Sequence, residues 1–246
     1  LYINKSAHHP MWAMEYSRDE GLRKYWDEYS YPYHKEGAGP LYRGKDASDY
    51  NHNQDMLAVE NIRRWFDYWQ ERPGTGTRIS SGGVKIIFSD TNTHFRGEEN
   101  YRRSGVTDAM RIPKDAFYAH QVMWDGWVDI EQPRIHIIGH WNYKEDVIKP
   151  VYVVSGADKV ELFLNGKSLG EGEREYHFLY TFKDVQFETG KLEAIGYDET
   201  GKECCRTELQ TAGKPEEIRL TFVQSPDGWK ADGADTVSYT HLTLPT

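Results

Sequence analysis

The chain has 246 residues, which is enough for one large domain or two smaller ones. Hydrophobic residues make up only 38%, but aromatic residues reach 14%, and burial of their rings argues against a disordered chain. A net charge of −9 argues against a nucleic-acid partner, and no apolar stretch approaches the roughly 18 residues that span a bilayer. The adjacent cysteines Cys204 and Cys205 predict no disulfide framework. Histidine spacing predicts no metal site, and no cofactor fingerprint is present.

The first expected element is residues 10–16, an apolar run that ends in a carboxylate and a tyrosine. Met11, Ala13 and Glu15 share one face of an extended strand, because side chains alternate along a strand. A carboxylate at the C-terminal end of a parallel strand lies where α/β barrels carry out chemistry. The alternative is that Glu15 is a surface residue just past a strand.

A polar and aromatic loop is expected up to about residue 50, with a short helix at residues 22–26. Four acidic residues in this loop are expected to form a solvated surface: Asp19, Glu20, Asp27 and Glu28. A clear helix follows, because Val59, Ile62 and Phe66 recur at helical spacing. Asn53 or Asp55 is its candidate cap, and residues 73–74 (Pro-Gly) end it.

The next expected strand is residues 84–88, after a glycine-rich turn at 80–83. Its continuous apolar run suits a strand covered on both faces. Polar residues follow it: Asp90, Asn92, His94 and Arg96. A helix is expected at residues 114–123. The first 131 residues therefore predict two βα units, fewer than the eight of a complete barrel.

Short strands dominate from residue 133 onward. They are expected at residues 134–139, 151–155, 160–164, 177–182, 191–197 and 205–210, with a hairpin turn at Asn165 and Gly166. This pattern predicts an antiparallel β-sandwich over residues 132–213, able to fold alone, whereas residues 1–130 alone should aggregate or remain loosely ordered. Residues 214–246 are expected to begin a further β domain at 218–222, and residues 237–246 resemble a translated sequencing adapter.

Four segments carry a resemblance to a known family. The segment Pro10 to Tyr16, the strand and polar residues 84–94, and the helix 113–118 (PKDAFY) leading to Trp124 resemble glycoside hydrolase family 2. Residues 160–170 (VELFLNGKSLG) are similar to the immunoglobulin-like domain of many bacterial members. The resemblance implies an α/β plus all-β chain: the C-terminal part of a TIM-type (β/α)8 barrel, then an immunoglobulin-like antiparallel β-sandwich.

The implied activity is that of a retaining, exo-acting glycoside hydrolase that forms a glycosyl-enzyme intermediate, with Glu15 as nucleophile. Residues 25–27, 72–76 and 89–94 look like a β-galactosidase-like subgroup, so terminal β-galactosides of algal or plant galactan oligosaccharides are the expected substrates. The family's acid/base Glu would lie upstream of residue 1, so this fragment alone should be inactive. The family also implies a periplasmic or secreted bacterial protein.

Two other functions stay open. A β-glucuronidase or β-mannosidase is the nearest competitor, and Arg96, Arg102 or Arg103 could clamp a uronic acid. A non-catalytic carbohydrate-binding or spacer module belongs to a different class, but it would not need strands that end in Glu15 and Asp90.

Sugar contacts are expected at the strand ends. Asp90, Asn92, His94 and Arg96 can bind hydroxyl groups, or else they tie down their own loop. Trp12, Trp124 and Trp127 can stack on a sugar, or else pack in the core. Tyr16 can donate a hydrogen bond to the nucleophile, or else simply pack.

Overall fold

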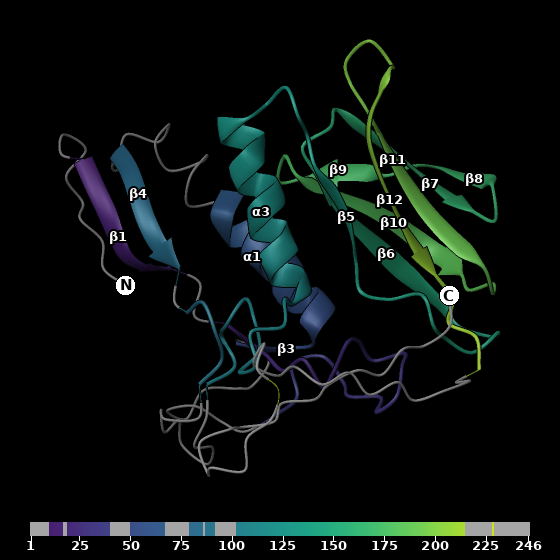
Figure 1. Cartoon of the computed structure of the whole chain (residues 1–246), viewed down its shortest axis with the longest axis horizontal. Coiled ribbons are helices and arrows are strands. Elements are labelled where there is room, and N and C mark those ends of the chain that lie inside the picture. Colours follow the sequence, from purple (N-terminus) through teal and green to yellow (C-terminus); the bar gives the residue numbers. More distant parts are fainter. Residues whose placement is uncertain are drawn as a thin grey trace. The chain divides into compact units, whose positions relative to one another are not determined.

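The computed structural model describes residues 10–16, 19–39, 50–66, 79–85, 87–91, 102–214 and 228. Residues 1–209 form one compact unit, and residues 210–246 form another. Within its described part, the first unit holds a parallel strand pair, two helices and two four-stranded sheets (Figure 1), and the two-residue strands β2 (Glu20–Gly21) and β3 (Asn51–His52) form a second, short parallel pair. The expected strand at 218–222 and the segment 237–246 lie outside the described residues.

The parallel pair consists of β1 (Pro10–Tyr16) and β4 (Ile79–Lys85), which lie side by side in Figure 1. β4 begins earlier than predicted, because the glycine-rich segment joins the ladder instead of forming a turn. Trp12 pairs with Gly82 and Ala13 with Gly83. The structure therefore contains two parallel strands in the expected order, while their place in a barrel stays a prediction.

Two helices pack against each other: α1 (Gln54–Phe66) and α3 (Asp115–Val128). The short helix predicted at residues 22–26 is a turn instead. Its carbonyl groups accept from the start of α1, since the amides of Gln54 and Asp55 donate to Tyr25 (2.8 Å) and Trp26 (3.1 Å). Those amides have no partner within the helix itself, so this turn caps α1.

The remaining strands form two four-stranded sheets. One has the order β5 (Ile135–Ile138), β6 (Ile148–Ser155), β10 (Leu179–Gln186), β9 (Glu173–Glu175). The other has the order β12 (Glu203–Gln210), β11 (Lys191–Tyr197), β7 (Lys159–Leu164), β8 (Lys167–Glu171). β10 runs antiparallel to β6, and β11 runs antiparallel to β7. The immunoglobulin-like topology stays a prediction.

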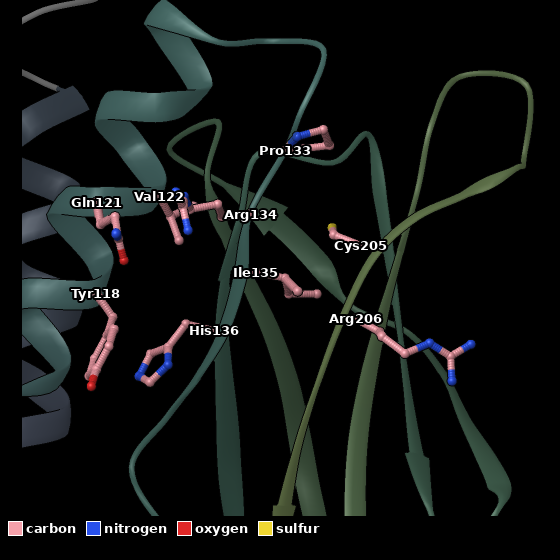
Figure 2. Close-up of a pocket in the computed structure, with 9 residues that line it drawn as sticks. All are labelled: Tyr118, Gln121, Val122, Pro133, Arg134, Ile135, His136, Cys205 and Arg206. Atoms are coloured by element: carbon pink, nitrogen blue, oxygen red, sulfur yellow. The ribbon is translucent and has the colours of Figure 1, made fainter.

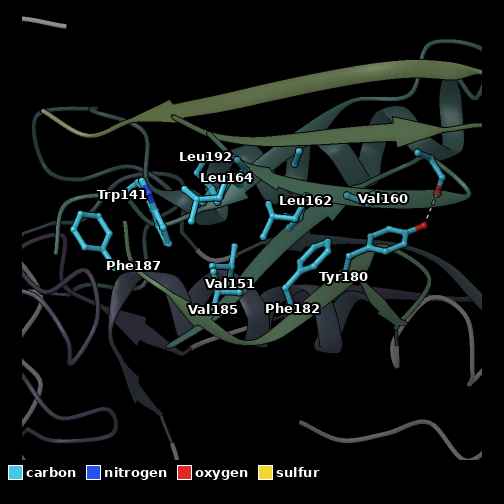
Figure 3. Close-up of a cluster of buried hydrophobic side chains, with 14 residues drawn as sticks. Trp141, Val151, Val160, Leu162, Leu164, Tyr180, Phe182, Val185, Phe187 and Leu192 are labelled. Carbon is cyan, nitrogen blue, oxygen red and sulfur yellow. Dashed lines mark hydrogen bonds between the residues drawn. The ribbon is translucent and has the colours of Figure 1, made fainter. Parts of the chain in front are cut away.

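One apolar core joins the two sheets (Figure 3). Val151 and Phe182 of the first sheet pack in the same cluster as Leu162 and Leu192 of the second. Tyr180 is also buried there, and its hydroxyl donates to the Ala157 carbonyl at 2.7 Å. Alternate residues of β7 are buried, as the sequence pattern predicted.

The hairpin between β7 and β8 forms at the predicted turn. Leu164 pairs with Lys167, which leaves Asn165 and Gly166 as the two loop residues. Their φ angles are 51° and 80°, and two successive positive φ angles define a type I′ turn. Asn and Gly are the residues that adopt this conformation most readily.

A second core joins the helices to the sandwich. Leu57 and Met123 of the helices cluster with Val154 and Phe178 of the sandwich, and all four are buried. One face of the sheet that contains β6 is thus covered by helices, so the two parts share apolar surface.

Candidate active site

Glu15 lies at an irregularity of the parallel ladder. Ala13 pairs with Gly83, and the next pair in the ladder is Tyr16 with Lys85, so two residues of β1 face one residue of β4. Such bulges turn side chains away from the regular alternation and are frequent beside active sites. The side chains of Trp12, Glu15 and Tyr16 lie outside the described residues. Their roles therefore stay predictions, although the backbone of Glu15 and Tyr16 lies at the C-terminal end of a parallel strand as expected.

Four acidic residues follow β1, and the prediction that they form a solvated surface is right for Glu28, which is exposed, but wrong for the other three. Asp19, Glu20 and Asp27 are only 3%, 4% and 2% exposed. Asp19 is 2.8 Å from the Nε atom of Arg64, and Glu20 accepts a hydrogen bond from the backbone amide of Arg103 at 3.3 Å. Arg64 and Arg103 are far from these carboxylates in the sequence, so no local sequence pattern predicted that the carboxylates are buried.

His52 lies between two carboxylates, those of Asp19 and Glu36. Its Nδ1 atom lies 2.5 Å from Oε1 of Glu36, and its Nε2 atom lies 3.6 Å from Oδ1 of Asp19. Burial by itself lowers the pKa of His52, but the hydrogen bonds to Asp19 and Glu36 outweigh it and raise the pKa to about 9. His52 is therefore a cation at neutral pH. Burial also acts to raise the pKa of Asp19, but His52 and Arg64 outweigh it and lower that pKa.

Lys114 connects the segments that follow the two parallel strands. It is completely buried, and its Nζ atom donates to the carbonyls of Gly21 (2.6 Å) and Arg103 (3.1 Å) and lies 2.8 Å from Oδ2 of Asp90. Burial lowers the pKa of Lys114, and the negative charge of Asp90 opposes that shift. A buried cation with this many acceptors holds its neighbours in one arrangement, because loss of a partner would leave charge uncompensated.

Asp90 is the only predicted sugar-binding residue whose side chain is described at these strand ends. Its Oδ1 atom also accepts from the amide of Gly105 at 2.9 Å. A Cβ atom at residue 105 would lie 2.4 Å from the backbone nitrogen of Asp90, so only glycine fits this approach. These contacts match the alternative role of Asp90, in which its side chain fixes the backbone of the loop region by hydrogen bonds. Contact between Asp90 and a sugar stays a prediction.

Lys85 is the last residue of β4. Its Nζ atom donates to the carbonyl of Ser104 at 2.9 Å. Burial lowers the pKa of Lys85 to about 7, although Asp19 acts in the opposite direction. This side chain can therefore hold or release a proton near neutral pH at the C-terminal end of the parallel pair.

The other predicted site residues are placed less favourably or are not described. Asn92, His94 and Arg96 lie outside the described residues, as does the side chain of Trp127. Trp124 is 59% exposed on α3. It lies nine residues beyond Asp115, or about 13 Å along the helix axis, whereas the buried network is at the helix start. Its position does not favour a sugar contact at the strand ends, and that role stays a prediction.

A separate pocket of about 440 Å³ lies between α3, β5 and β12 (Figure 2). His136 stacks on Tyr118 with ring centroids 4.4 Å apart, and its Nε2 atom lies 2.9 Å from Oδ1 of Asp115. The two arginines of the pocket already have carboxylate partners: Arg134 pairs with Asp125, and Arg206 pairs with Glu203. None of the predicted site residues lines this pocket, so we place the candidate active site at the strand ends.

Sequence reasoning missed the buried network around these strand ends. Three of its residues carried a signal: Lys114 lies within the helix motif at residues 113–118, and Asp90 and Arg103 were candidate sugar contacts, but their mutual contacts were not predicted. In the part of the chain that the structure describes, no group of three or more His, Cys, Asp or Glu residues is arranged to hold a metal. In that same part, no helix has the length and apolarity needed to cross a membrane.

Comparisons with known proteins agree with this architecture. A family described as "Domain of unknown function (DUF4982)" matches residues 146–205, within the sandwich. A β-glucuronidase of Formosa agariphila is 35% identical over 92% of this chain and 22% of its own length. A β-galactosidase of Bacteroides ovatus is 37% identical over 53% of this chain and 15% of its own length.

Solved structures of related enzymes also match most of this chain. A β-glucuronidase from glycoside hydrolase family 2 superposes with a TM-score of 0.70 at 31% identity, over 91% of this chain and 22% of that one. A Bacteroides uniformis β-glucuronidase gives a TM-score of 0.54 at 22% identity, over 82% of this chain and 22% of its own, and shows the fold alone.

In its fold and in these relatives, the chain is similar to a segment of enzymes of the glycoside hydrolase class. The chain belongs to glycoside hydrolase family 2. It spans about a fifth of the length of the β-glucuronidases that it matches.

Proposed function

We propose that the full-length protein containing this chain is a retaining β-glycoside hydrolase with Glu15 as its nucleophile. The observation that carries the proposal is the two-to-one register of β1 and β4 at Glu15, one residue before β1 ends. The buried charges of Asp19, His52 and Lys114 support it, because they give fixed positions to the segments that leave these strands.

The chemistry needs two carboxyl groups about 5–5.5 Å apart. The Glu15 carboxylate attacks the anomeric carbon, and the bond from that carbon to the leaving oxygen breaks. The second carboxyl group donates its proton to that oxygen. Water then attacks the glycosyl ester, gives its proton to the second group, and releases Glu15. We assign the second carboxyl group to no residue of this chain.

A β-glucuronide is the substrate that the relatives favour. The β-glucuronidase of Formosa agariphila matches 92% of this chain, whereas the β-galactosidase of Bacteroides ovatus matches 53%. Terminal β-galactosides, the substrates expected from the sequence motifs, are the second candidate. A uronic acid needs a cation. Arg103, one of the cations named from the sequence, is only 7% exposed and donates to Asn51 at 3.0 Å, and Lys85 at the end of β4 is only partly protonated near neutral pH because burial lowers its pKa to about 7. We also propose a periplasmic or secreted protein, from the family resemblance alone.

The test uses the full-length protein with nitrophenyl β-glucuronide, β-galactoside and β-mannoside. We expect one of them to be hydrolysed and a matching fluorosugar to form an ester with Glu15, detected by mass spectrometry. Glu15→Gln should abolish both, while Glu173→Gln on the exposed strand β9 should change neither. Normal turnover by Glu15→Gln would refute the proposal. Hydrolysis of none of these glycosides, together with glycan binding, would favour the non-catalytic module. The 246-residue chain alone should be inactive.

A further inference from the structure

Two tyrosines are displayed on the loop that follows β1. Tyr31 is 83% exposed and Tyr33 is 49% exposed. Their ring centroids are 6.2 Å apart and the rings are perpendicular. Isolated exposed rings are common, but two rings set against each other form an apolar surface of the kind that marks binding sites.

The loop holds these rings in a fixed conformation. Tyr33 has a φ of 57°, a left-handed conformation that a residue with a large side chain rarely adopts. Its amide donates to the carbonyl of Ser30 at 2.6 Å. Ser30 in turn donates to Asp27 through both its amide and its hydroxyl, each at 2.9 Å.

Asp27 fixes this loop to the sandwich. Its carboxylate lies 3.3 Å from the Nζ atom of Lys149, and the hydroxyl of Tyr143 donates to it. The side chains of Asp27 and Lys149 are only 2% and 4% exposed. Both charges are buried. If the loop left the sandwich, one of them would remain in the protein interior without its partner, so the ion pair holds the loop in place.

The sandwich also contributes a side chain to the tyrosine surface. Lys144 follows Tyr143 directly, and its Nζ atom lies 5.2 Å from the ring centroid of Tyr33. A hydrogen bond to Tyr33 raises the pKa of Lys144, so this amine is a charged donor at neutral pH.

We propose that Tyr31, Tyr33 and Lys144 form a subsite for a sugar ring in the leaving-group part of an oligosaccharide. The inference rests on the proposed function: if the terminal sugar occupies the site at Glu15, the rest of the glycan must extend over the neighbouring surface, and this loop follows β1 in the chain after the short strand β2. The C–H face of a pyranose packs on a tyrosine ring. The Lys144 amine donates to a hydroxyl group of that sugar.

The experiment compares two substrates in the full-length protein: a nitrophenyl monosaccharide and a trisaccharide with the same terminal sugar. Tyr31→Ala and Lys144→Ala should each raise KM for the trisaccharide by about fivefold, the size expected from loss of one ring contact or hydrogen bond. KM for the nitrophenyl glycoside should stay within about twofold. Tyr118→Ala, which removes another solvent-accessible tyrosine on α3, is the matched control and should affect neither substrate.

Two kinetic results would overturn the subsite. One is an equal rise in KM for both substrates. The other is a fall in thermal stability with equal loss of activity on both, as expected if Tyr31 contacts another part of the full-length protein. Calorimetric binding of the trisaccharide to the Glu15→Gln protein separates the two proposals. If no glycoside is hydrolysed but Tyr31→Ala weakens this binding, the hydrolase proposal fails and the subsite stands. Binding that Tyr31→Ala leaves unchanged refutes the subsite.

Discussion

The ring of Phe178, the residue just before strand β10, packs directly against Gly126 in the last turn of helix α3. A Cβ atom added at residue 126 would lie only 2.5 Å from Cε1 of Phe178. Phe178 is 1% exposed and belongs to the core shared with the helices. A glycine in a helix interior costs stability, and here it permits close packing between helix and sheet.

Gly126→Ala should therefore destabilise the protein by about 1–3 kcal/mol, although alanine favours helices, because the Phe178 ring must move within a packed core. Gly156→Ala is the matched control, since its nearest neighbouring atom would be at an ordinary 3.5 Å. Urea unfolding measures both variants. A Gly126→Ala protein as stable as its control would contradict the packing described here.

The sandwich should be less stable alone than with helix α3. Ile138, Val154, Phe178 and Leu179 are buried in the core shared with the helices. Cutting the chain at residue 132 exposes this apolar surface, so we expect a loss of more than about 3 kcal/mol relative to a fragment of residues 113–213. Chemical denaturation of the two fragments is the measurement. Equal midpoints would support the sequence-based prediction of an independent sandwich.

Breaking the buried pair of Asp27 and Lys149 should be costly. Lys149→Met leaves the Asp27 carboxylate without its cation, and we expect a loss of about 3–5 kcal/mol in the free energy of unfolding. Lys159→Met is the control, because the side chains of the Lys159–Glu171 pair are 59% and 64% exposed, and such pairs contribute about 1 kcal/mol or less. If both substitutions cost the same, burial does not set the strength of the Asp27 pair.

His52 should make stability depend on pH. Its pKa is about 9 in the folded chain, against about 6.5 when unfolded. A raised folded pKa means that its contribution is complete below pH 6.5 and is lost as the pH rises to about 9. The stability difference between the wild type and His52→Gln should therefore shrink over this range.

His120 provides an internal control for that titration. Burial lowers its pKa to about 4, so its contribution changes only below pH 6.5. The difference between the wild type and His120→Gln should be constant between pH 6.5 and 9. A His52 difference that stays equally constant would show that Asp19 and Glu36 do not stabilise its charge.

Local sequence patterns were enough to predict much of the fold. The alternation in residues 160–164 and the Asn165–Gly166 pair predicted β7 and its hairpin, because period-two burial and a type I′ turn depend on adjacent residues. Helical periodicity predicted α1 for the same reason. The motif at residues 10–16 also placed Glu15 at the end of a strand, and the comparisons confirmed the family.

The candidate site was decided by tertiary structure. Whether Asp19 is solvated or buried depends on Arg64, 45 residues away, and the position of Lys114 depends on the Gly21 carbonyl, 93 residues away. The bulge at Glu15 likewise exists only because β4 pairs with β1 in a shifted register. A charged residue looks like surface in a sequence, because the cost of burying it is offset only by partners that the folded chain brings together.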